Sequence, residues 1–367
     1  MRITQISAHT VSTNYRDAWQ HDRRYYIKTE NQANTILTVE TDSGLSGIGE
    51  AAHSPGLYGE TPSSTLGALN LVKPHLLGRQ ALNRNELLNL VDRVMPLGNL
   101  AFISALDQAF HDLAGKALNV PVVELLGGKA HQTLPTHISP PTNDSCLDYL
   151  NDFLSQGYRV FKIKMSGDTR YDLDLIGNAL DAVGESVTLA LDANQGWSVP
   201  QTLAIAHAIQ AHPSFKDNII LEQPVRGNDF EGMAQIRRGT RLRLMADDGI
   251  RTNADLLRLI RLEAADIVSI KISRVGGIRK ALAMVAMAEA ANLLYIIDEI
   301  NEMRVCNTAV AHLALATRAP LYTGVTCHLL LERDVVAEGG VRVINGQAVI
   351  DDQPGLGIGR LNLDTDN

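Results

Sequence analysis

The sequence predicts an α/β protein whose larger part is a barrel of parallel strands joined by helices. From about residue 132, short β-rich runs alternate with helical segments at spacings of about 25–30 residues, the pattern of repeated βα units. Several runs are almost continuously apolar, as in strands buried on both faces. Charged residues follow at the ends of the runs. The eight predicted strands are 133–138, 159–165, 187–194, 219–224, 242–247, 267–273, 293–298 and 321–325.

The first 130 residues or so lack this alternation and predict a separate unit. Segments 2–11 and 33–41 alternate as strands do, and a turn follows at Thr41-Asp42-Ser43-Gly44. The polar, aromatic segment 14–32 is too long for a tight turn and is expected to form a flap. A second loop, 53–63, is rich in Gly, Pro and Ser, and long loops are often functional. Helical periodicity follows over 101–117.

These patterns divide the chain into three parts. Residues 1–128 are expected to form an N-terminal domain that carries the two loops, and 129–340 the barrel. The last part, 341–367, is rich in Gly and Pro and has little helical pattern. We expect it to fold back on the first domain.

The composition excludes several classes of protein. With 45% hydrophobic and 20% charged residues among 367, the chain is not mainly disordered. A net charge of −8 argues against a nucleic-acid partner. Three widely spaced cysteines, Cys146, Cys306 and Cys327, indicate a reducing compartment. No signal peptide or membrane span is apparent, so the protein is expected to be cytoplasmic.

Three consecutive predicted strands end in a carboxylate: Asp192, Glu222 and Asp247. Their separations are 222 − 192 = 30 and 247 − 222 = 25, which is one βα unit each. Because the C-terminal ends of barrel strands meet at one face, these groups would repel one another unless a cation lay among them. Oxygen ligands favour Mg²⁺, or Mn²⁺, over zinc. Alternatively, each carboxylate caps a helix or pairs with a nearby Lys or Arg.

Lysines stand at the ends of two other strands. Lys162 and Lys164 are two residues apart and therefore share one face of their strand, while Lys271 ends a strand across the barrel. We expect each of these two lysines, together with a nearby cation, to lower the pKa of the other lysine. A lowered pKa suits a general base. The alternatives are solvated lysines at 162 and 164 and a simple ion pair for Lys271. Asp248 faces away from its neighbour Asp247 and is expected to orient Lys271.

In combination, these motifs resemble the enolase superfamily, and within it the muconate-lactonizing subgroup. The resemblance covers most of the chain. It is carried by Lys162-Ile-Lys164, Asp192-Ala-Asn194, Glu222-Gln-Pro224, Ala246-Asp247-Asp248 and Lys271-Ile-Ser-Arg-Val-Gly-Gly277, and in the first domain by Gly47-Ile-Gly49-Glu50-Ala51, Ala105-Leu-Asp107, Asp112-Leu-Ala-Gly115-Lys116, Pro121 and Leu125-Leu-Gly-Gly128.

The resemblance implies a (β/α)7β barrel covered by an α+β capping domain. It further implies that Asp192, Glu222 and Asp247 hold Mg²⁺ and that Lys164 and Lys271 are the acid–base pair. Lys162 and Asn194 would give electrostatic support. The family also implies a homo-oligomer.

The substrate is less well defined by the sequence. Asp298-Glu299 is similar to family members that act on proline betaines and hydroxyprolines, whereas Ile300-Asn301-Glu302 differs from their usual continuation. The Asp-x-Asp of the dipeptide epimerases is replaced by Tyr322-Thr-Gly-Val325, which argues against a dipeptide. The residues expected to bind substrate are Asn194, Asp298, Glu299, Tyr25, Arg24 and Tyr58.

The expected reaction begins with removal of the proton α to a carboxylate, through an enediolate whose charge the metal stabilises. Two lysines on opposite faces favour racemisation or epimerisation of a small carboxylate, such as an amino-acid derivative. Dehydration, cycloisomerisation to a lactone and non-catalytic binding of a small molecule remain as alternatives.

Overall fold

The computed structural model describes residues 1–16, 31–141, 143, 145–215 and 217–363. Two expected substrate-binding residues, Arg24 and Tyr25, lie outside this part of the chain. None of the helices in the described part has the length and apolar character that crossing a bilayer requires.

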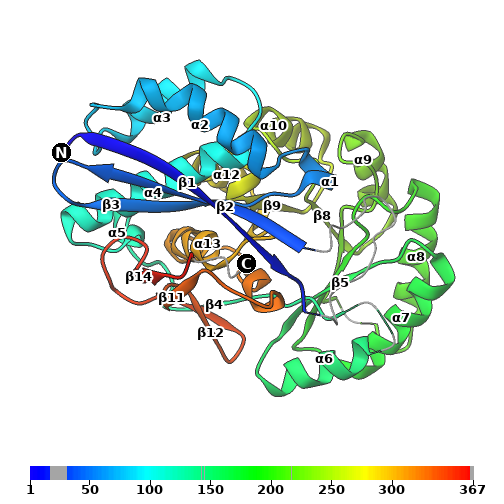
Figure 1. Cartoon of the computed structure of the whole chain (residues 1–367). Coiled ribbons are helices and arrows are strands. Elements are labelled where there is room, and N and C mark those ends of the chain that lie inside the picture. Colours follow the sequence, from blue (N-terminus) through cyan, green and yellow to red (C-terminus); the bar gives the residue numbers. More distant parts are fainter. Residues whose placement is uncertain (17–30, 142, 144, 216, 364–367) are drawn as a thin grey trace.

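The N-terminal part is a three-stranded antiparallel sheet packed against helices (Figure 1). Its strands follow one another in space as in sequence, and β1 and β2 pair along nearly their whole length. The elements are β1 (Ile3–Asn14), β2 (Asn31–Thr41), β3 (Ser46–Ala51), α1 (Pro55–Tyr58), α2 (Pro62–Leu76), α3 (Arg84–Val94), α4 (Leu100–Leu118) and α5 (Val122–Leu125).

The second part contains six regular parallel strands in sequence order. Single β-bridges from Ile138 to Phe161, from Ile297 to Thr323 and from Thr136 to Thr323 join the first and eighth predicted strands to this sheet and to each other, so the ring closes. The strands are β5 (Val160–Lys164), β6 (Thr188–Asp192), β7 (Ile219–Glu222), β8 (Arg243–Ala246), β9 (Ile267–Lys271) and β10 (Leu294–Asp298).

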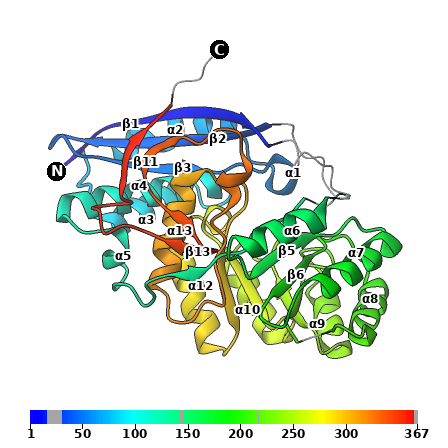
Figure 2. The same cartoon turned by 90° about the horizontal axis from the view of Figure 1, so that it is seen from below.

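A helix follows each barrel strand except the last, which confirms the (β/α)7β arrangement with a capping domain (Figure 2). Figure 2 shows β1–β3 on one side of the molecule and helices such as α7 to α9 on the other. The barrel helices are α6 (Cys146–Ser155), α7 (Thr169–Ala182), α8 (Val199–Ala211), α9 (Phe230–Gly239), α10 (Asn253–Leu262), α11 (Ile272–Val275), α12 (Ile278–Ala290) and α13 (Arg304–Ala316).

The C-terminal segment touches both parts. Strand β13 (Gln347–Val349) pairs with β12 (Arg342–Ile344) and with β4 (Leu134–Pro135), next to the first barrel strand. The backbone of Gly355 exchanges hydrogen bonds of 2.8 and 3.0 Å with Val122 and Val120 beside α5. The remaining elements are the 3-10 helix Cys327–Leu330, β11 (Val336–Gly339) and β14 (Ile358–Leu361).

Close packing of α4 on β3 fixes the position of the capping sheet. A Cβ atom at Gly49 would lie 2.0 Å from the carbonyl oxygen of Ala105, and one at Gly47 would lie 2.1 Å from that of Ala109. Because real Cβ atoms do not approach an oxygen this closely, only glycine fits between the strand and the helix backbone. The next residue on β3, Glu50, is thereby held at the boundary with the barrel.

We expect Gly49→Ala to destabilise the protein by about 2–3 kcal/mol, since the added methyl group must push α4 away from β3. Gly67→Ala is the matched control. Gly67 is exposed on α2, a Cβ atom added there would have nothing within 4 Å, and alanine favours helix. Thermal unfolding followed by circular dichroism should show a lower midpoint for the first variant alone. Equal midpoints would contradict this account of the packing.

Candidate active site

The parallel register brings the predicted groups to one end of the barrel. Lys164 pairs in register with Asp192, and Asp192 with Glu222, so three neighbouring strands end at the same level. Across the barrel, Lys271 pairs in register with Asp298. The side chains of these residues are buried or nearly so. The structure therefore brings together the carboxylates and lysines that the sequence singled out.

Each predicted metal-binding carboxylate has a cationic partner. Lys162 Nζ donates to Glu222 Oε1 at 2.9 Å, and Lys164 donates to Asp192. Asp247 accepts from Lys271 at 2.7 Å and from Arg274 at 2.7 Å. The ion pairs considered as an alternative for these residues are thus present in the structure.

The carboxylates nevertheless retain capacity for a metal ion. Glu222 Oε2 is buried and has no hydrogen-bond partner among the described residues. One oxygen each of Glu222, Asp247 and Asp298 lies within 4.8 Å of the others. Burial, together with the charge of Asp192, raises the pKa of Glu222 to about 8. A cation placed here would supply the missing partner, so the donor set fits a divalent ion with oxygen ligands.

The expected lowering of the pKa of Lys162 and Lys164 involves a bound cation and stays a prediction. Burial lowers the pKa of Lys162 and of Lys271, but the surrounding carboxylates outweigh burial and hold both above the usual range. For Lys162 the stronger of these are Asp298 and Glu222, and for Lys271 they are Asp247 and Asp298.

Asp248 does not orient Lys271 in the way expected. It accepts hydrogen bonds from Tyr58 Oη at 3.2 Å and from Gln195 Nε2 at 3.1 Å, whereas Lys271 is held by Asp247. Tyr58 thus joins the capping domain to the end of β8. Asn194 follows β6, and its backbone N–H donates to Asp192 at 2.8 Å.

Asp298 and Glu299 have different surroundings, although they are adjacent. Asp298 is fully buried and accepts from Lys162 at 2.8 Å and from Ser269 at 3.0 Å. Burial raises the pKa of Asp298, but Lys162 and Lys271 outweigh it and hold this pKa well below its usual range. Its other oxygen lies 2.7 Å from His137 Nε2. Asp298 therefore holds the ammonium group of Lys162 in place by a hydrogen bond. Glu299, in contrast, lines the pocket.

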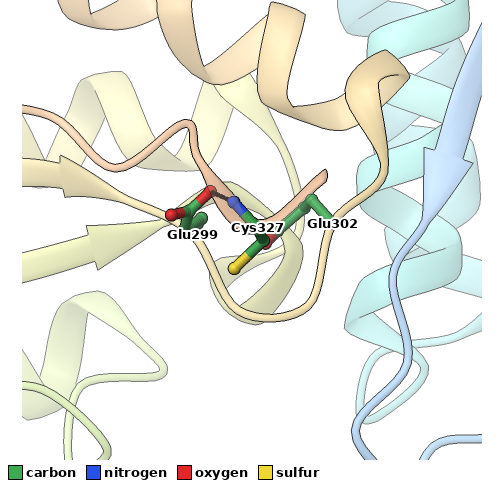
Figure 3. Close-up of side chains that lie close together, drawn as sticks. All are labelled: Glu299, Glu302 and Cys327. Carbon is green, nitrogen blue, oxygen red and sulfur yellow. Dashed lines mark hydrogen bonds between the residues drawn. The ribbon is translucent and has the colours of Figure 1, made fainter. Parts of the chain in front are cut away.

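Glu299 belongs to a cluster with Glu302 and Cys327 on the loops after the seventh and eighth strands (Figure 3). Its carboxylate accepts from Asn307 Nδ2 at 2.9 Å, from Thr326 Oγ1 at 3.0 Å and from the backbone N–H of Cys327 at 2.8 Å. Glu302 accepts from Ser273 Oγ at 3.1 Å and from the backbone N–H of Ile300. These hydrogen bonds join the two loops into one wall of the pocket.

One pocket connects these groups. Its walls combine all three lysines with side chains from the capping domain and from the loops after the first, seventh and eighth strands. The lining residues are Tyr15, Leu57, His137, Ser139, Pro140, Lys162, Lys164, Asn194, Asp248, Lys271, Glu299, Ile300, Asn301, Thr326, Cys327 and Leu330. The sequence argument gave no role to His137 or to Arg274. His137 could have been noticed as an ionisable side chain in an otherwise uncharged first strand.

The capping domain holds the loop after β10 through Glu50 and Asn34. Glu50 accepts hydrogen bonds from the backbone N–H groups of Met303 at 2.7 Å and Cys306 at 2.9 Å, at the start of α13. Asn34 Nδ2 donates to Glu50 at 2.7 Å and to the carbonyl oxygen of Asn301 at 2.9 Å. Burial raises the pKa of Glu50 to about 7, although these donors lower it. The pocket wall at Asn301 is thus positioned by the other domain.

Glu50→Ala should lower the free energy of unfolding by about 2 kcal/mol, because it leaves buried N–H donors of Met303 and Cys306 without an acceptor. Thermal unfolding measures this loss. Glu86→Ala removes a carboxylate that is exposed on α3 and pairs only at the surface, so its midpoint should stay close to that of the parent chain. If the two variants unfold at the same temperature, Glu50 does not join the domains as described.

Comparison with known proteins identifies related chains. A family described as "Enolase C-terminal domain-like" matches residues 146–361. The N-terminal domain family of mandelate racemase / muconate lactonizing enzyme matches residues 11–127. An N-succinyl-L-Arg/Lys racemase from Bacillus cereus is 29% identical over 100% of this chain and 97% of its own.

Solved structures agree with this result. The substrate-liganded L-Ala-D/L-Glu epimerase from Bacillus subtilis has a TM-score of 0.92 and 26% identity, covering 99% of this chain and 100% of its own. A dipeptide epimerase from Enterococcus faecalis, complexed with Mg and the dipeptide L-Leu-L-Tyr, has a TM-score of 0.90 and 27% identity, covering 98% of this chain and 99% of its own. Both relatives are enzymes that invert a carbon centre.

Proposed function

Because the chain belongs to the mandelate racemase / muconate lactonizing enzyme family of the enolase superfamily, we propose that it racemises or epimerises an amino-acid derivative. The reaction would invert the carbon atom next to a carboxylate by removing its proton and returning a proton to the other face. One observation carries the proposal: Lys164 and Lys271 line the same pocket from β5 and β9, with the three carboxylate-bearing strand ends between them.

We assign the metal ion to Asp192, Glu222 and Asp247 and propose Mg²⁺, with Mn²⁺ as the other candidate. The buried, unpartnered Glu222 Oε2 supports this assignment. When bound, the cation would stabilise the negative charge that develops on the substrate carboxylate as the α-proton leaves. Asp298 is a further candidate for a ligand, since one of its oxygens lies within 4.8 Å of one oxygen each of Glu222 and Asp247. Its oxygens already have partners, but so do those of Asp192 and Asp247.

The three lysines have different roles in the proposed reaction. Lys164 and Lys271 approach from strands separated by β6, β7 and β8, so each can exchange a proton at a different face of a bound substrate. Lys162 is tied to Glu222 and Asp298 at 2.9 and 2.8 Å, which suits a fixed positive charge better than a mobile base. Asn194, Asp248 and Glu299 stand in the pocket walls as candidates for substrate contact.

A screen of carboxylates in D₂O with Mg²⁺ tests the proposal. The panel contains N-succinyl and N-acetyl amino acids, dipeptides, proline betaine, hydroxyprolines and cis,cis-muconate. Loss of the α-proton signal in the NMR spectrum, together with appearance of the other stereoisomer, is the expected result. Loss of water or closure of a lactone would instead indicate the dehydratase or cycloisomerase alternative. Saturable binding with no exchange would indicate a binding protein.

Lys164→Ala and Lys271→Ala should each abolish racemisation, with activity at least about 10³-fold lower. Each variant should still exchange the α-proton of one stereoisomer with solvent, because the remaining lysine serves one face. The two variants should therefore favour opposite stereoisomers in D₂O. Exchange of both stereoisomers by either variant would contradict the division of work between the two lysines.

Removal of metal with a chelator should abolish exchange, and Mg²⁺ should restore it. Glu222→Gln should weaken Mg²⁺ binding at least about tenfold, measured by calorimetric titration, because it removes one charged oxygen ligand. Glu231→Gln is the control, since Glu231 is exposed and pairs with Arg258 on α10 instead of lining the pocket. Unchanged binding in Glu222→Gln would refute the assigned ligand set.

A further inference from the structure

Helix α1 contributes a side chain to the pocket although it has no core of its own. It spans only Pro55–Tyr58, and none of its residues is buried. Leu57 nevertheless lines the pocket together with Lys164 and Lys271. A helix this short is stable only through tertiary contacts. The position of Leu57 therefore depends on the few contacts that α1 makes with its surroundings.

The capping domain fixes the two ends of the segment that contains α1. Before the helix, the ring of His53 is hydrogen-bonded to Thr65 Oγ1 at 2.9 Å. After it, the carboxylate of Glu60 accepts from two backbone N–H groups at the start of α4, at 2.8 and 2.9 Å. Residues 54–59 therefore form a short bridge that is anchored at both ends on one domain, while its middle contacts the barrel.

The barrel holds α1 through Arg251, which follows the turn at the end of β8. Arg251 Nη2 donates to the carbonyl oxygen of Leu57 at 3.0 Å, and its guanidinium carbon lies 4.8 Å from the centre of the Tyr58 ring. The guanidinium is always charged, so it is attracted to the face of the ring. The hydroxyl group of the same ring donates to Asp248 at 3.2 Å. Two residues of one barrel loop thus hold Tyr58, one at its face and one at its hydroxyl group.

The backbone of Arg251 is itself well fixed. The preceding residue, Ile250, is fully buried, and its N–H group donates to the carbonyl oxygen of Asp247 at 3.0 Å. The N–H group of Arg251 donates to Asp255 Oδ2 at 3.2 Å, in the first turn of α10. The side chain of Arg251 therefore starts from a turn that directly follows Asp247, a proposed metal ligand. The position of α1 is in this way tied to the strand end that would hold the metal.

We infer that Arg251 is a positioning residue, which fixes α1 and thereby places Leu57 against the bound substrate. Arg251 does not itself line the pocket. It acts through the backbone of Leu57 and through the ring of Tyr58. The effect on turnover rests on the proposed function, whereas the position of α1 can be measured without any substrate.

Hydrogen–deuterium exchange of the whole protein, measured by mass spectrometry, tests the position of α1. The reporters are the backbone N–H groups of Leu57, Tyr58 and Gly59, which donate to carbonyl oxygens at the start of the helix. The variant Arg251→Met keeps the length of the side chain but removes its charge and its donors. In this variant the three amides should exchange about tenfold faster, because a hydrogen bond and a cation–π contact are lost. The amides of α4 should keep the rate of the parent chain.

Two further variants separate the charge of Arg251 from other effects. Arg251→Lys keeps a cation that can lie over the Tyr58 ring, so its exchange should stay within about threefold of the parent rate. Arg258→Met is the matched control, because Arg258 is exposed on α10 and lies 4.9 Å from the centre of the Phe230 ring, and it should exchange like the parent. Parent-like exchange in Arg251→Met, or equal acceleration in α1 and α4, would overturn the inference. Lysine and methionine variants that exchange equally fast would overturn the role of the charge.

Turnover gives a second measurement, with the substrate that reacts fastest in the screen. Arg251→Met should raise KM at least about threefold, because α1 is out of place in part of the protein and must be ordered on binding. It should leave kcat within about twofold, since Arg251 lies outside the pocket. An unchanged KM, with or without a lower kcat, would contradict the role in substrate binding. If the parent chain turns over no carboxylate in the screen, the proposed function fails, while the exchange rates still decide whether Arg251 fixes α1.

Discussion

Compensation of buried charge at the end of the barrel is the constraint on which the site depends. Six carboxyl groups and four cationic groups meet there, and the pKa of Glu222 is raised to about 8 by burial and by the charge of Asp192. Unpaired charges are very costly away from water. The groups are Asp192, Glu222, Asp247, Asp248, Asp298 and Glu299 on one side and Lys162, Lys164, Lys271 and Arg274 on the other.

The sequence predicted the barrel and its charged residues because both follow from short-range rules. Strands recur at one βα interval, and parallel register places their ends at one level, so Asp192 and Glu222 had to be neighbours. The ring closes as predicted, but single bridges at Ile138 and Thr323 complete it, whereas the other strands form regular ladders. Homo-oligomeric assembly and a cytoplasmic location stay predictions.

The parts that sequence reasoning missed depend on contacts between distant segments. The contact between His137 and Asp298 joins residues 161 positions apart in the chain, and no local sequence pattern predicts it. The raised pKa values of Lys162 and Lys271 likewise depend on how many carboxylates surround each amine in space. Residue type and spacing indicate which groups reach the site. Which groups pair with one another, and how their pKa values shift, depends on how the side chains pack.

The contacts of Asn34 and Glu50 with the loop 301–306 have a consequence for how such enzymes diversify. The barrel supplies the reacting groups, but part of the wall that selects the substrate takes its shape from a strand of the other domain. Exchanging capping domains between relatives would therefore disturb the recipient's own loop, even if every residue of the barrel were kept. New specificities in this scaffold would be reached more readily when the two domains change together than when either is grafted alone.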